Sequence, residues 1–218
     1  VALVVGATPE AAEQGARAVA VRYEQLPHTF AVDEALAVGV PQVHAGGNLL
    51  AEEAVEIGDA TAALAAGASL EATYRTPFQA HMAIEREAAL AYFDEEGRLA
   101  VICANHEPHW NQRYLATILG LPAERLRVIT PPIGGSFGGK QDVWPMAAAA
   151  LATFHLRRPV RLAYTRREVM AAAPKRHPYT CRVRVGATPD GRFTGMSFDA
   201  QINTGAYDSA GRFMGNYA

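Results

Sequence analysis

The chain has 218 residues, and half of them are hydrophobic, so it can form the core of one large domain or two small ones. Its 20 Lys and Arg residues nearly balance 22 Asp and Glu residues, which gives no electrostatic case for binding nucleic acid or an anionic membrane. No apolar run reaches about 18 residues, so no membrane span is predicted, and no signal peptide is predicted either.

The N-terminal region predicts a strand, a helix and a linker. Residues 1–5, "VALVV", predict the strand, and the helix is expected to begin after Thr8 as N-cap, with Pro9 as its first residue. Pro27 ends this unit. Residues 31–59 form a connection rich in Gly and Pro with only short helical potential, expected to run over another domain's surface. A short helix follows, with Asp59 as cap and Gly67 as stop.

From residue 70 onward the pattern predicts an α+β fold with a mixed sheet, because strands and helices do not alternate strictly. Helices are expected at residues 107–120, with Tyr114, Leu115 and Ile118 as the apolar face, and at residues 141–156. Residues 179–207 predict a long hairpin whose "TPDG" turn places Gly191 at positive φ. Single strands are expected at five further places: residues 70–76, 87–94, 98–104, 125–131 and 159–165.

The two cysteines, Cys103 and Cys181, lie far apart in apolar strand-like runs and are expected to be buried thiols. A structural disulfide stays open as an alternative. Two cysteines cannot supply the four thiolates of an iron–sulfur cluster. The chain begins at Val1 without a methionine and stops without a terminal cap, so we expect it to be a piece of a longer polypeptide.

A glycine-rich stretch, "TPPIGGSFGGKQD" at residues 130–142, carries the chemistry. Gly134, Gly139 and Lys140 fit the spacing of a phosphate-binding loop. That interpretation is disfavoured, because Gln141 stands where a Ser or Thr must hold Mg²⁺. Glycines also let backbone amides approach an anion or oxo ligand closely. Phe137 would then shape a pocket for a planar substrate, or, alternatively, the stretch is a tight turn with Phe137 in the core.

At these residues the sequence resembles the molybdenum-binding subunit of the xanthine dehydrogenase and aldehyde oxidase family. "GGSFGGK" is followed by an apolar helix, and "YRTPFQAHMAIEREAALA" keeps His81 and Glu85 of a family segment, with Ala83 and Arg86 where prolines are usual. "VRYEQLP" resembles the end of the family's hammerhead domain. Three further segments extend the resemblance over nearly the whole chain: "LGLPAERLRV", "RRPVRLAYTRREVMAAAPKRHP" and "DGRFTGMSFDAQINTGAY".

The resemblance implies three parts. Residues 1–30 would be the C-terminal part of a hammerhead-like α/β domain, residues 31–69 a linker, and residues 70–218 the N-terminal part of a molybdopterin-binding domain. It implies a molybdenum-dependent oxidoreductase located in the cytoplasm. Such an enzyme hydroxylates an aldehyde or an N-heterocycle with water as oxygen source. A non-catalytic interaction or scaffold domain derived from the same fold is the alternative.

The implied cofactor is molybdenum–molybdopterin, in a dinucleotide form, and electrons would pass to iron–sulfur and FAD domains or subunits. The chain has two cysteines and lacks a G-x-G-x-x-G loop between a strand and a helix, so these carriers must sit elsewhere. The catalytic base is expected in a C-terminal molybdenum-binding portion outside this chain. The chain alone is therefore expected to be inactive.

By resemblance, the cofactor contacts are His106, Gly135, Phe137 and Gly138, with the Gly138 amide donating a hydrogen bond to the molybdenum group. No side chain of this chain is expected to ligate the metal. His106 replaces the family's usual glutamine and can still donate a hydrogen bond, although a solvated loop histidine is the alternative.

Phe137 and Gln141 are expected to line the substrate pocket. Purine-oxidising members carry a glutamate where this chain has Gln141, so a xanthine substrate is disfavoured. Glu85 is expected in a buried ion pair or as a hydrogen-bonded strand carboxylate, not as the base.

Overall fold

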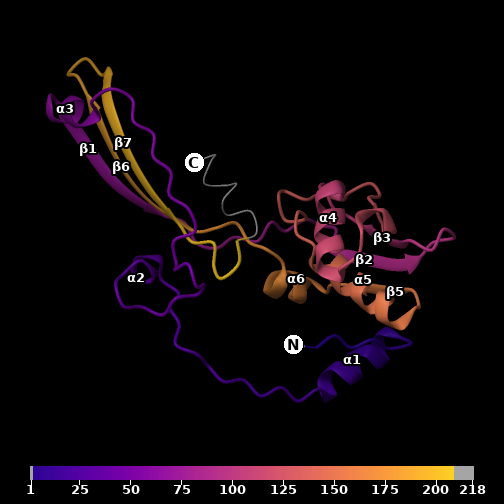
Figure 1. The fold of residues 1–218 in the computed structure, drawn as a ribbon. Coiled ribbons are helices and arrows are strands. Elements are labelled where there is room, and N and C mark those ends of the chain that lie inside the picture. The colour runs from indigo at the N-terminus through magenta and orange to yellow at the C-terminus, as the bar shows by residue number, and fades with distance from the viewer. Residues whose placement is uncertain (1, 209–218) are drawn as a thin grey trace. The chain divides into compact units, whose positions relative to one another are not determined.

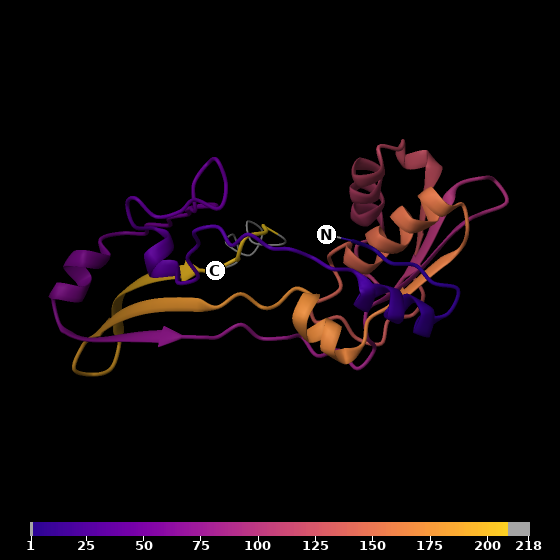
Figure 2. The ribbon, with the colours of Figure 1, turned by 90° about the horizontal axis from the view of Figure 1, so that it is seen from below.

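The computed structural model describes residues 2–208. The chain divides into two compact units, each assembled from two separate stretches of sequence. The first unit combines the chain up to Glu24 with Ala80–Lys175, and the second combines Gln25–Gln79 with the chain from Arg176 onward. Figure 1 labels the elements of both units, and Figure 2 shows the same ribbon from below.

The first unit is built on a four-stranded sheet with the order β4-β3-β2-β5. β2 pairs antiparallel with β3 and with β5, whereas β3 pairs parallel with β4. The predicted α+β fold with a mixed sheet is thereby confirmed. The bounds are β2 (Ala88–Phe93), β3 (Leu99–Cys103), β4 (Leu126–Ile129) and β5 (Val160–Ala163), with a 3-10 turn η1 (Ala123–Arg125) before β4.

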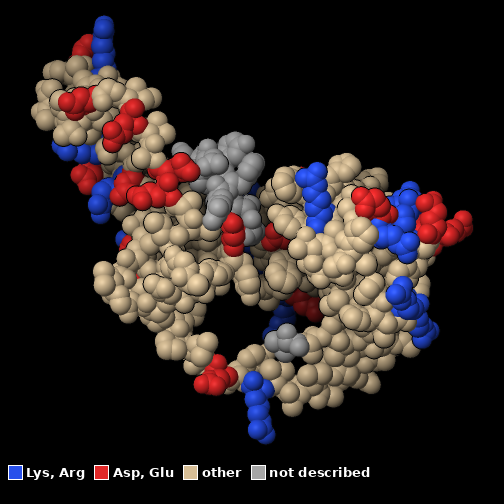
Figure 3. All heavy atoms as spheres, in the orientation of Figure 1, with Lys and Arg blue, Asp and Glu red and all other residues tan. Residues whose placement is uncertain are grey.

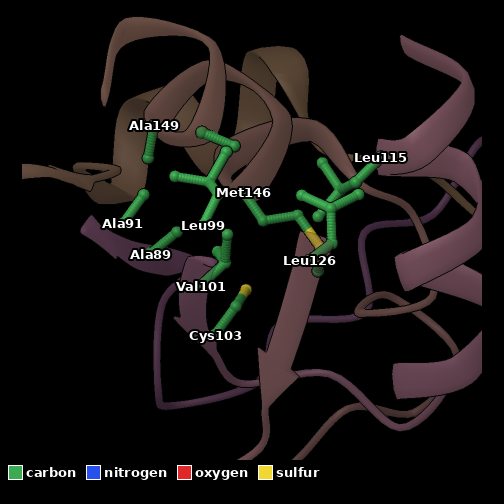
Figure 4. Close-up of a cluster of buried hydrophobic side chains, with 10 residues drawn as sticks. Ala89, Ala91, Leu99, Val101, Cys103, Leu115, Leu126, Met146 and Ala149 are labelled. Carbon is green, nitrogen blue, oxygen red and sulfur yellow. The ribbon is translucent and has the colours of Figure 1, made fainter. Parts of the chain in front are cut away.

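Two helices, α4 (Pro108–Leu119) and α5 (Trp144–Leu156), pack on this sheet and close the core. Figure 4 shows side chains of β2 and β3 facing Met146 and Ala149 of α5, with Leu115 of α4 and Leu126 of β4 beside them. Met146 and Leu115 are fully buried. The apolar helix expected at residues 141–156 is therefore a core helix, as predicted.

The expected apolar face of α4 is only partly correct. Leu115 is buried, but Tyr114 is 53 % and Ile118 50 % exposed. The side chain one turn before Leu115 is Asn111, which is also fully buried. Residues four apart share a helix face, so the buried stripe runs through Asn111 and Leu115. Gly120 ends the helix in the left-handed conformation.

The N-terminal helix forms as α1 (Pro9–Ala18), with the Thr8 side chain accepting the Ala11 N–H. The expected strand before it is wrong for the described residues 2–5, which form no strand. Apolar character alone does not make a strand, because a strand needs a partner for its backbone groups.

A helix not foreseen from the sequence, α6 (Arg166–Ala172), follows β5. Thr165 and Glu168 form a complete capping box at its start, since each side chain bonds the backbone N–H of the other residue. At its end the Lys175 ammonium donates to the carbonyls of Val169 and Ala173. Lys175, for which the sequence suggested no role, therefore caps this helix.

The second unit contains an antiparallel sheet with the order β1-β6-β7. β6 (Tyr179–Ala187) and β7 (Phe193–Ile202) form the predicted hairpin, and Gly191 has φ 85° in its turn. β1 (Ala68–Arg75) pairs with β6 from more than a hundred residues away. Two short helices precede β1, namely α2 (Val32–Ala35) and α3 (Ala60–Ala65), and Asp59 caps α3 as predicted.

One face of this three-stranded sheet is covered by α3 at one end only, and the other face is apolar and exposed. α3 packs where Gly186 pairs with Gly195, because a Cβ at Gly195 would lie 2.9 Å from the Ala63 Cβ. Side chains of the opposite parity point to the other face. The apolar sheet face there carries four large exposed side chains: Leu70 75 %, Tyr74 61 %, Met196 60 % and Phe198 47 %.

Charged side chains of both signs are spread over the face of the molecule drawn in Figure 3. This distribution agrees with the formal net charge of −2. Within residues 2–208, none of the helices is both long enough and apolar enough to cross a bilayer.

Candidate functional site

The glycine-rich stretch forms a tight loop between β4 and α5, which we call the glycine loop (residues 134–140). The Gly139 N–H donates to the Ser136 carbonyl at 2.9 Å and closes a four-residue turn. Both central residues of this turn have positive φ, 53° at Phe137 and 92° at Gly138, as in a type I′ turn. Gly135 adds a third positive φ of 98°. The loop is thus a compact backbone cradle, and Phe137 occupies a conformation that bulky residues rarely adopt.

The loop packs closely against the segment around His81 and Glu85, which precedes β2 in the sequence. A Cβ added at Gly139 would lie 2.9 Å from the His81 ring, and one at Gly134 would lie 2.7 Å from the Glu85 Cβ. A Cβ at Gly135 would lie 3.2 Å from the Phe137 ring. These distances explain why the loop needs glycine at these positions: its inner side is already filled.

Phe137 is 65 % exposed, so the alternative that places it in the core is wrong. The ring lies against Gly135 and leaves most of its surface open. Gln141 follows directly after the loop and is partly buried. The loop therefore presents an exposed aromatic side chain.

His106 lies beside the glycine loop, although 30 residues separate it from Ser136 in the sequence. Its Nδ1 is 2.9 Å from the Ser136 Oγ, and the same hydroxyl accepts the Lys140 N–H at 3.3 Å. The side chain of His106 is otherwise exposed. The structure thus brings together His106, Gly135, Phe137 and Gly138, the four predicted cofactor contacts.

Asn105, which precedes His106, is a supporting residue whose role the sequence did not reveal. It is 1 % exposed, and its amide donates to the Cys103 carbonyl and the Thr130 hydroxyl. Its oxygen accepts the Glu107 N–H and the Asn111 amide. These bonds join the ends of β3 and β4 to the start of α4, so Asn105 fixes the place from which His106 projects. A polar residue two positions after the end of a buried strand was its sequence signal.

Lys140 is not free to hold a phosphate. Its side chain is 1 % exposed, and its ammonium lies 2.5 Å from the Glu85 carboxylate. The ion pair expected for Glu85 is present, but only its Lys140 end is buried, because the Glu85 side chain is 37 % exposed. Glu85 lies in a loop and not in a strand. The Lys140 ammonium donates a hydrogen bond to Glu85 and holds the pKa of that carboxyl below its usual range, against the opposing effect of burial.

A narrow crevice borders the glycine loop and is lined by Glu87, Cys103, Lys140, Trp144 and Tyr164, among others. Burial raises the pKa of the Cys103 thiol to about 12, so this thiol is not a nucleophile at neutral pH. Burial also lowers the pKa of the nearby Lys175 and raises that of Tyr164. Among residues 2–208, no three His, Cys, Asp or Glu side chains are grouped to hold a metal ion.

Known proteins resemble this chain along most of its length. The family model described as "Molybdopterin cofactor-binding domain" matches residues 43–218. The chain is 35 % identical over 212 residues to the nicotinate dehydrogenase large molybdopterin subunit of Eubacterium barkeri. It is 34 % identical over 213 residues to the xanthine dehydrogenase molybdenum-binding subunit of Escherichia coli O157:H7. Each match covers 97 % of this chain, but the chain spans only 50 % and 28 % of those relatives, respectively.

Among solved structures, the aldehyde oxidoreductase of Desulfovibrio gigas matches with a TM-score of 0.86 and 27 % identity. The match covers 95 % of this chain and 23 % of that enzyme's chain. The glycine loop, His106 and both sheets lie within the residues that these relatives match.

Proposed function

Because the chain belongs to the molybdopterin cofactor-binding domain family, we propose that it forms part of a molybdenum hydroxylase that oxidises an aldehyde or an N-heterocycle. Relatives of this chain are named as nicotinate, xanthine and aldehyde oxidoreductases. The observation that carries the proposal is the glycine loop, where positive φ values at Gly135, Phe137 and Gly138 shape a cradle beside His106.

The residues of this loop fit a molybdenum–pterin group. Within residues 2–208, the Gly138 N–H makes no hydrogen bond, so its donor remains available to a ligand. Gly135 and Gly138 have positive φ, so the backbone there takes a shape that residues with a Cβ rarely adopt. We assign the cofactor contacts to His106, Gly135, Phe137 and Gly138, with the amide of Gly138 and the ring of His106 as hydrogen-bond donors.

When bound, the cofactor supplies the redox chemistry, in which the substrate carbon loses two electrons and water provides the oxygen. This chain orients the reactants. The Phe137 ring offers a flat apolar surface for the substrate, and Gln141 offers a neutral amide at the pocket. Because Gln141 carries no charge, it cannot act as a charged partner for a purine, which disfavours a xanthine substrate. The base that activates the reaction is assigned to the part of the enzyme outside this chain.

The partners follow from the same proposal. Two electrons must leave the site, and we assign their transfer to iron–sulfur and FAD domains or subunits. We further propose that the cofactor is in a dinucleotide form and that the complex is located in the cytoplasm. We also retain the division into a hammerhead-like part (1–30), a linker (31–69) and a molybdopterin-binding part (70–218). The apolar sheet face supports a contact with the remaining molybdenum-binding portion, because the chain spans half or less of its relatives.

The test uses the native complex that contains this chain. We expect it to oxidise aldehydes or N-heterocycles with an artificial electron acceptor, and to place ¹⁸O in the product when the reaction runs in ¹⁸O-labelled water. The isolated 218-residue chain should show no such activity. A pure complex that lacks both activity and molybdenum would overturn the proposal and favour a scaffold domain.

A further inference from the structure

One carboxylate holds both ends of the glycine loop. Oε2 of Glu85 accepts the N–H of Gly134, the first loop residue, at 2.8 Å. The same oxygen lies 2.5 Å from the ammonium of Lys140, the last loop residue. Glu85 is about fifty residues away in the sequence, so this is a tertiary restraint and not part of the local turn.

The Lys140 ammonium depends on this contact. The side chain of Lys140 is 1 % exposed, whereas that of Glu85 is 37 % exposed. A buried ammonium without a partner is strongly unfavourable, so an ion pair of this kind differs from an exposed one, which contributes little. The pairing therefore keeps Lys140 folded under the loop and away from any ligand.

Glu85 is itself held in place from the opposite side. Arg166 of α6 donates from Nη2 to the carbonyls of Ala83 at 2.8 Å and Ile84 at 2.9 Å. The His81 ring fills the space under Gly139. A chain of direct contacts therefore runs from α6 through residues 83–85 to the glycine loop.

From these contacts we propose that Glu85 is a positioning residue which, by holding Gly134 and Lys140, keeps the Phe137–Gly138 turn in its positive-φ form. The importance of that turn for the cofactor rests on the proposed function, but the restraint itself does not. In this proposal Glu85 acts through the loop, since its Oε2 is already engaged by the Gly134 N–H and the Lys140 ammonium.

The experiment compares four forms of the native complex: wild type, Glu85→Gln, the double variant Glu85→Gln with Lys140→Met, and Asp94→Asn. Asp94 is the control, since its carboxylate likewise bonds backbone N–H groups and a cationic side chain, here two N–H groups and an arginine in the β2–β3 hairpin. Amide hydrogen exchange of residues 134–140 is the main readout. Molybdenum content and its electron paramagnetic resonance signature are measured on the same samples.

We expect Glu85→Gln to speed exchange in the glycine loop by about tenfold or more, with β2 and β3 unchanged, and to alter the molybdenum signature. The double variant removes the buried charge, so it should fold well if Glu85→Gln alone does not. It should still show fast loop exchange, because the restraint on Lys140 is gone. Asp94→Asn should affect only its own hairpin.

Loop exchange at the wild-type rate in the double variant would overturn the proposal, because Glu85 would then only neutralise Lys140. Faster exchange with an unchanged molybdenum content and signature would confirm the positioning role of Glu85. The same result would contradict the assignment of the loop to the cofactor. The positioning role of Glu85 and the proposed cofactor site can therefore fail independently.

Discussion

The ammonium of Lys140 and the carboxylate of Glu85 lie 2.5 Å apart beneath the glycine loop, with the lysine almost entirely removed from solvent. A lysine next to a glycine-rich loop invites comparison with nucleotide-binding proteins. Here the ammonium is already paired inside the protein, and Gln141 stands at the position where such proteins need a hydroxyl. The glycines therefore serve backbone shape and close approach.

The ion pair of Glu85 with Lys140 makes the stability of the folded chain depend on pH in the acid range. Its pKa is lowered in the folded chain, chiefly by the hydrogen bond from Lys140. The resulting stabilisation is fully present above the unfolded pKa of about 4.3, and it is lost as the pH falls through the lowered folded pKa. We expect the thermal midpoints of wild type and Glu85→Gln to converge as the pH falls below about 4. Replacement of the exposed Glu95 by Gln should not change the pH profile, and a gap that stays constant in acid would contradict the prediction.

Gly138→Ala tests the backbone cradle, with Gly97→Ala as its control. Both glycines have positive φ, 92° and 71°, and a methyl group meets ordinary contacts or open space. Each alanine should cost about 1–2 kcal/mol because L residues avoid this region. Only Gly138→Ala should also reduce the turnover of the native complex, by about tenfold or more. Calorimetry and steady-state rates check both parts, and equal activity in the two variants would show that the loop is only a structural turn.

Phe137→Ala tests the substrate surface. The ring is 65 % exposed, so its removal should change the free energy of unfolding by no more than about 0.5 kcal/mol. The kcat/KM of the native complex for planar substrates should fall about tenfold or more, because a flat apolar contact is lost. Phe193→Ala, at an 83 % exposed ring in the β6–β7 hairpin, is the control and should leave kcat/KM unchanged. Unchanged kcat/KM in Phe137→Ala would exclude the ring from the pocket.

Cys103 should resist thiol reagents. It is 4 % exposed, and burial raises its pKa to about 12. At neutral pH, mass spectrometry after alkylation should find Cys103 unmodified in the folded chain and modified after denaturation. Modification of Cys103 without unfolding would show that the crevice beside the glycine loop opens to solvent.

Local chemistry in the sequence predicted the ends of several elements. Thr8 and Asp59 cap helices, and Gly120 and Gly191 take positive φ, as their residue types and spacing indicate. The capping box of Thr165 was present in the sequence as T-x-x-E, yet α6 was not expected.

Other features could not be read from local patterns. The burial of Asn111 instead of Tyr114 depends on which side of α4 faces the sheet. The pairing of β1 with β6 joins residues more than a hundred positions apart. The partner of Glu85 was also not identifiable, because only the fold brings Lys140 to it. Within the site, the sequence indicated the candidate cofactor contacts by residue type. The contacts that position them are tertiary and could not be predicted from local patterns.

The central claim is that the glycine loop belongs to a molybdenum cofactor site. Elemental analysis of the native complex tests it most directly, with molybdenum counted per copy of this chain. We expect about one molybdenum atom per chain, together with iron and flavin from the partner domains or subunits. A pure, intact complex with no molybdenum would contradict the assignment, whatever its other activities.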